Sequence, residues 1–72
     1  MELKEMRENV GLRQADVAKK LRVSIPAVSN WENGVNGIAS KNIKPLSKLY
    51  GVPESEIKAI ADAIRAINKE GA

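Results

Sequence analysis

The chain has 72 residues, of which 43% are hydrophobic and 29% are charged, so it has the length and composition of one small globular domain. It lacks cysteine, histidine and any apolar run of about 18 residues, which argues against disulfides, thiolate or histidine chemistry, a membrane span and a signal peptide. The net charge of +3 is uneven: residues 12–50 sum to +5, and the segments on either side sum to −1 each.

The first third of the chain predicts two short helices. The apolar residues at helical spacing are Leu3, Met6 and Val10 in the first and Val17, Ala18 and Leu21 in the second. Gly11 follows the first set, where a left-handed residue usually ends a helix, so the first helix is expected over residues 2–10. The second is expected to begin at Gln14 and to end at residue 21 or 22.

A third helix is predicted directly after the second. Ser24 is a good N-cap, and Pro26 lies in the first turn, where its missing N–H costs little. The residues expected to face inward are Val28 and Trp31. Asn33 and Gly34 end the helix, and residues 35–39 read as a loop.

Two more helices complete the chain. For the fourth we favour Asn42 over Ser40 as N-cap, because Asn42 would place Pro45 in the first turn rather than in the costly interior. Its apolar residues are Leu46, Leu49 and Tyr50, and Gly51 stops it. The fifth is expected over about residues 54–68, with isoleucines at spacings of three and four: Ile57, Ile60, Ile64 and Ile67.

This order predicts a single all-α domain over residues 1–72, a compact five-helix bundle with a central helix-turn-helix in residues 14–34. Two helices that cross over a tight turn need apolar packing positions and one small residue for close approach. The apolar positions are Val17, Leu21, Val23, Val28 and Trp31, and the small residue is Ala18.

Residues 12–24 and 28–34 resemble the Cro and repressor-like (lambda-repressor-like) helix-turn-helix family, and the likeness extends over about residues 3–58. It implies a five-helix fold and prokaryotic or phage transcription control. By position, Gln14 would bind a DNA phosphate at the start of the second helix, and Arg7 and Glu32 would form an ion pair between the first and third helices. The third helix would enter the major groove, with Asn30 as the best candidate for a base contact.

The candidate DNA-binding residues are therefore Arg13, Gln14, Ser24, Ile25, Pro26, Ala27, Ser29, Asn30 and Lys41. Three features depart from the family pattern. Residues 25–27 are apolar and cannot exchange hydrogen bonds with bases, and residues 35–39 carry no charge to neutralise phosphates. Arg22 stands at the turn where relatives commonly have glycine, and it is strained if its backbone is left-handed.

These departures leave a second hypothesis open. The apolar start of the third helix could bind a related repressor protein, as small phage antirepressors of this fold do, and block its DNA binding. The candidate protein-interface residues are Ile25, Pro26, Val35, Ile38, Ile64 and Ile67. The last two are candidates for a homodimer interface, because the family fold closes near residue 57 or 60.

The leading hypothesis is a cytoplasmic regulator that binds double-stranded DNA, a partner suited to the basic middle segment. No nucleophile and base stand at a recognisable spacing, so we expect no enzymatic activity, catalytic residue, metal or other cofactor, and no membrane or small-molecule substrate among the partners.

Overall fold

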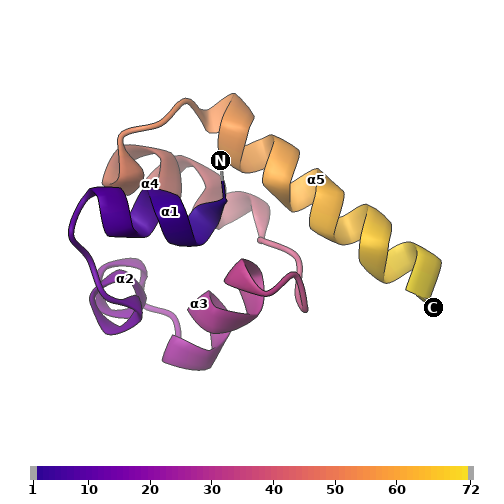
Figure 1. Ribbon diagram of the computed structural model, residues 1–72, viewed down its shortest axis with the longest axis horizontal. Coiled ribbons are helices and arrows are strands. Elements are labelled where there is room, and N and C mark those ends of the chain that lie inside the picture. The colour runs from indigo at the N-terminus through magenta and orange to yellow at the C-terminus, as the bar shows by residue number, and fades with distance from the viewer. Residues whose placement is uncertain (1, 72) are drawn as a thin grey trace.

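Five helices make up the chain in this computed structural model, which describes the backbone of residues 2–71 and the side chains of residues 2–66. They are α1 (Leu3–Asn9), α2 (Gln14–Leu21), α3 (Ile25–Glu32), α4 (Ser40–Tyr50) and α5 (Glu54–Gly71) (Figure 1). No strand occurs in residues 2–71. The predicted all-α, five-helix class is confirmed.

The bounds of the helices follow the sequence closely in the first half of the chain. Helices α2 and α3 begin at the predicted residues, and α1 differs from its prediction by one residue at each end. Helix α5 continues to Gly71, beyond the expected end near residue 68. None of the described helices combines the length and the apolar character that a membrane crossing requires.

The predicted start of α4 was wrong. The helix begins at Ser40 after Ala39, so Pro45 lies inside it, and Asn42 is buried within the first turn rather than capping it. Starting at Ser40 brings Asn42, Leu46 and Tyr50 onto one buried face at a spacing of four residues. The packing of this face outweighs the backbone hydrogen bond that Pro45 cannot donate.

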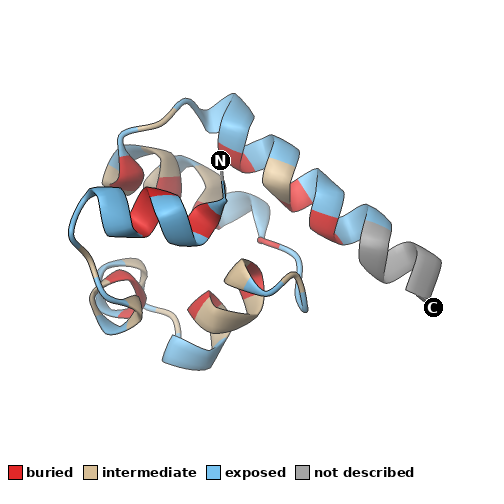
Figure 2. Ribbon diagram, in the orientation of Figure 1, coloured by how far each residue is buried: buried red, intermediate tan, exposed pale blue. Residues whose placement is uncertain are grey.

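One apolar core joins all five helices (Figure 2). Its buried members are Leu3, Met6, Val17, Ala18, Val28, Trp31, Ile38, Leu46, Tyr50, Ile57, Ala61 and Ile64. Helices α2 and α3 meet in a dry seam, where Val17 is fully buried and Val28 is 1% exposed. Val23 and Leu21 pack partly buried against the same cluster, so the predicted packing positions of the helix-turn-helix lie together.

Two residues expected at a protein interface belong to this core instead. Ile38 is 3% exposed and Ile64 is 5% exposed, so neither side chain is available to a partner on the surface of the folded chain. Ile38 turns inward from the loop after α3, and Ile64 continues the buried face of α5 begun by Ile57 and Ala61. The side chain of Ile67, the other interface candidate on α5, lies outside the described residues.

Candidate nucleic-acid interface

The first turn of α3 is exposed at one edge of the molecule (Figure 2). Ser24 caps it, because its Oγ accepts a hydrogen bond of 3.2 Å from the backbone N–H of Ala27. Pro26 lies in the first turn, where no backbone donor is needed. Ile25 is 48% exposed, so the start of the helix presents an apolar residue to solvent.

The inner face of α3 fixes the helix to the core. Val28 and Trp31 are buried on its inner face, which confirms that the indole of Trp31 serves packing rather than stacking on a base. Because one face is held by the core, the opposite face is presented in a fixed orientation. The exposed face of α3 can therefore contact a binding partner without rearrangement of the helix.

The remaining candidates on α3 are only partly accessible. Ala27, Ser29 and Asn30 are half-buried, and Ala27 packs against the core. The Oγ of Ser29 accepts a hydrogen bond of 3.3 Å from Nδ2 of Asn33, one turn further along. Of the group predicted for DNA contact on this helix and its cap, Ser24, Ile25 and Pro26 are the exposed members.

The predicted ion pair between α1 and α3 is present. Arg7 Nε donates to Glu32 Oε2 at 2.6 Å and Nη2 to Oε1 at 3.1 Å, while Nη1 donates to the carbonyl oxygen of Leu12 at 3.0 Å. The two charged side chains are 11% and 6% exposed. A bidentate pair of this kind ties α1, the start of the α1–α2 loop and the end of α3 together.

Glu32 has a second partner that the sequence did not predict. Gln14, the first residue of α2, donates from Nε2 to Glu32 Oε1 at 3.0 Å. This bond engages one of the two amide protons of Gln14 within the chain and fixes the direction of the amide at the start of α2. Sequence spacing gave no signal for it, since the two residues lie on different helices 18 positions apart.

The electrostatics of this cluster are set by burial and by the ion pair. Burial alone would raise the pKa of Glu32, but the hydrogen bonds from Arg7 and Gln14 outweigh it and hold the pKa below its ordinary value. The hydrogen bond to Glu32 raises the pKa of Arg7. Burial, with a contribution from Glu32, raises the pKa of Tyr50 to about 12.

The two predicted cationic contacts lie on the surface. Arg13, directly before α2, pairs with Asp16 at 3.3 Å, and its backbone N–H donates to the same carboxylate at 2.9 Å. The hydrogen bonds from Arg13 lower the pKa of Asp16. Lys41 is exposed in the first turn of α4. Both cations are accessible to a polyanion.

Comparison with known families identifies the family to which this arrangement of helices belongs. A family model described as helix-turn-helix matches residues 3–57, most of the chain. The chain belongs to the Cro and repressor-like helix-turn-helix family. The comparisons with curated proteins and with solved structures give no match. As a member of this family, the chain is a DNA-binding transcription regulator, in which α2 and α3 form the helix-turn-helix.

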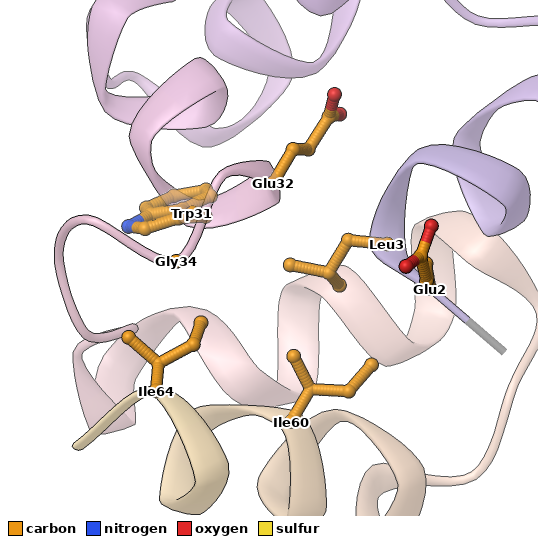
Figure 3. A pocket seen from close by; sticks show the side chains of 7 residues that line it. All are labelled: Glu2, Leu3, Trp31, Glu32, Gly34, Ile60 and Ile64. Carbon is orange, nitrogen blue, oxygen red and sulfur yellow. The ribbon is translucent and has the colours of Figure 1, made fainter. Parts of the chain in front are cut away.

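A small pocket of this helix-turn-helix domain lies away from the exposed start of α3. It measures about 160 Å³ and is lined by Glu2, Leu3, Trp31, Glu32, Gly34, Ile60 and Ile64. Figure 3 shows Ile60 and Ile64 of α5 pointing toward Leu3 and the indole of Trp31. None of the predicted DNA-binding residues lines it. In the part of the chain that the structure describes, no cluster of acidic residues could hold a metal ion.

Proposed function

We propose that this protein is a prokaryotic or phage transcription regulator that binds double-stranded operator DNA with α3 in the major groove. The observation that carries the proposal is that α3 has two different faces: Val28 and Trp31 anchor its inner face in the core, and its first residues are exposed on the outer face. An α-helix fits the major groove, and helix-turn-helix proteins use the N-terminal residues of the second helix to contact base edges.

The charges around this helix suit a phosphate backbone. The exposed cations on α2, on its flanking residues and on α4 are Arg13, Lys19, Lys20, Arg22, Lys41, Lys44 and Lys48. Gln14 and the N-terminal end of α2 add a hydrogen-bond donor and a positive helix end. Neutralised phosphates release counterions, so affinity should fall as salt rises. The proposed state on DNA is a homodimer on a two-fold symmetric operator.

The test is a selection of bound duplexes from a random-sequence library, followed by fluorescence anisotropy of the selected duplex at two salt concentrations. Asn30→Ala is expected to weaken binding to the selected duplex by about 1–3 kcal/mol, because one amide can make two hydrogen bonds to adenine. Binding to an unselected duplex should change little, since phosphate contacts remain.

Asn36→Ala is the matched control, because Asn36 is the same residue type, exposed in the loop after α3 and outside the predicted DNA-binding group. It should leave the preference for the selected duplex intact. A wild-type protein that binds neither selected nor bulk duplex at low salt would remove the proposal.

A second candidate function rests on a different observation. Ile25 and Val35 are 48% and 55% exposed, and large apolar side chains on a surface favour protein contacts. The chain would then act as an antirepressor that covers the DNA-reading surface of a related repressor with the start of α3. Ile25→Glu should abolish complex formation with such a repressor in a pull-down, and a complex that survives this substitution would contradict this function.

A further inference from the structure

Four of the helices are followed by a residue with a left-handed backbone, and one of these residues is not glycine. After α1, α3 and α4 the chain passes through a left-handed residue that is glycine: Gly11, Gly34 and Gly51, with φ of 71°, 72° and 68°. After α2 the corresponding residue is Arg22, with φ 57° and ψ 45°. Within residues 2–71, Arg22 is the one non-glycine residue with positive φ.

The backbone at Arg22 does nothing that glycine could not do. The N–H of Val23 donates to the carbonyl of Ala18 at 2.9 Å, and the N–H of Arg22 donates to that of Lys19 at 3.4 Å. The end of α1 has the same pair of bonds around Gly11. The N–H of Leu12 donates to the carbonyl of Arg7 at 3.1 Å, and the N–H of Gly11 donates to the carbonyl of Glu8 at 3.0 Å. A side chain in this conformation costs free energy that glycine avoids, so helix termination alone does not explain the arginine.

Local interactions do not explain it either. A cation at the C-terminal end of α2 interacts favourably with the negative end of the helix dipole. Lys19 and Lys20 in the last turn already supply this interaction. Arg22 is exposed, and within the described part of the chain no hydrogen bond or ion pair engages its guanidinium. Among the residues whose side chains the structure describes, Arg22 therefore has no partner whose interaction offsets the strained backbone.

The position of Arg22 supplies a function. Arg22 lies in the short link between α2 and α3, two residues before the Ser24 cap. Its Cα is therefore within about 8 Å of the Ser24 Cα. A guanidinium can bind two oxygens of one phosphate at once, and it remains charged at any working pH. Strained residues that persist in a fold commonly serve its site.

We propose that Arg22 is a DNA-phosphate contact at the turn of the helix-turn-helix, and that its left-handed backbone is tolerated for this contact. The inference rests on the proposed DNA-binding function, which counts Arg22 only among the surrounding cations, and adds a specific phosphate contact at this residue. It predicts that stability and affinity change in opposite directions at this position.

The experiment measures both properties for Arg22→Gly, Arg22→Asn and Arg22→Lys. Thermal unfolding should give a higher Tm for the glycine variant and a smaller rise for asparagine, because both residues tolerate a left-handed backbone. Anisotropy titration of a labelled random-sequence duplex at several salt concentrations should give affinities about three- to tenfold lower for these two variants. The slope of log K against log salt should be smaller by about one. The lysine variant should bind more tightly than either, with the Tm of the wild type.

Arg65→Ala on α5 is the control for loss of one positive charge, since Arg65 is exposed on a different helix. It should leave the salt slope unchanged. If wild type binds the duplex and Arg22→Gly binds it equally with the same slope, the inference is overturned while the proposed function stands. If wild type does not bind duplex DNA at low salt, both are overturned.

Discussion

Glu32 accepts hydrogen bonds from two side chains that belong to different helices. Arg7 approaches from α1 and Gln14 from α2, so one carboxylate holds the ends of three helices together. Because both charged side chains of the ion pair are almost completely removed from solvent, loss of either partner leaves the other charge poorly compensated. The cluster includes Gln14, the first residue of the helix-turn-helix, so it links fold stability to the geometry of the DNA-binding elements.

Replacement of this carboxylate should have a pH-dependent cost. The folded-state pKa of Glu32 lies below its ordinary value of 4.5, so its contribution to stability is complete above pH 4.5 and is lost as pH falls through the lower folded-state value. Glu32→Gln is expected to lower the free energy of unfolding by about 1–3 kcal/mol at neutral pH. The difference from wild type should shrink in acid. Urea unfolding followed by the fluorescence of the single tryptophan measures both.

Asp16→Asn provides the control for this substitution. Asp16 pairs with an arginine whose side chain is 84% exposed, and surface pairs of this kind contribute little. Its change in stability should be small compared with that of Glu32→Gln. If Glu32→Gln lowers the free energy of unfolding by the same amount at neutral and acidic pH, the prediction that the cluster stabilises the ionised carboxylate of Glu32 is wrong.

The two partners of Glu32 differ in how far the sequence could predict them. The Arg7–Glu32 pair was predicted, because the family likeness assigned both positions. The bond from Gln14 was missed: which of several nearby acceptors an amide selects depends on how α2 and α3 cross, and the sequence does not specify distances between helices. Gln14 was assigned to a phosphate alone, and that role stays a prediction.

Helix α4 is destabilised by a proline in its interior, and a single substitution can measure this effect. Pro45 lies inside it, where a proline removes one backbone hydrogen bond and crowds the carbonyl four residues earlier. Pro45→Ala should restore the N–H and raise the free energy of unfolding by about 1–2 kcal/mol, less than the full helix preference because the ring is half-buried and its burial is lost. Thermal denaturation followed by circular dichroism measures the gain.

Pro26→Ala is the matched control for this prediction. Pro26 lies in the first turn of α3, where its missing N–H has no partner in the helix, so its replacement should not stabilise the protein. A fall in Tm for Pro45→Ala would mean that contacts of the proline ring exceed the cost to the helix.

The elements that sequence predicted well are those whose ends are marked by local chemistry. Ser24 and the glycines after α1 and α3 fix helix bounds within a few residues of chain, whatever the rest of the fold does. The start of α4 could not be read in this way. The local penalty at Pro45 pointed to Asn42, whereas burial of the face that Asn42 shares with Leu46 and Tyr50 decided the outcome.

For the whole molecule, the open question in the sequence was whether the second half of α5 belongs to the core or to an interface between copies. The structure places Ile64 in the core, and Figure 3 shows it directed toward Trp31 across the small pocket. Sequence could not decide this, because a buried stripe on a helix has the same spacing whether it packs on its own chain or on another. Helix α5 therefore contributes to the core over at least part of the stretch that the sequence left open as a candidate dimer interface.

Ile64→Ala tests this placement. Removal of a core isoleucine side chain is expected to lower the free energy of unfolding by about 2–4 kcal/mol, through lost burial and an enlarged cavity beside Trp31. Because the contacts are within one chain, the loss should be independent of protein concentration, whereas an interface residue would give a loss that depends on concentration. Lys58→Ala, an exposed change on the same helix, should have little effect. A concentration-dependent loss for Ile64→Ala, accompanied by a smaller sedimentation coefficient, would instead place this residue between two copies of the chain.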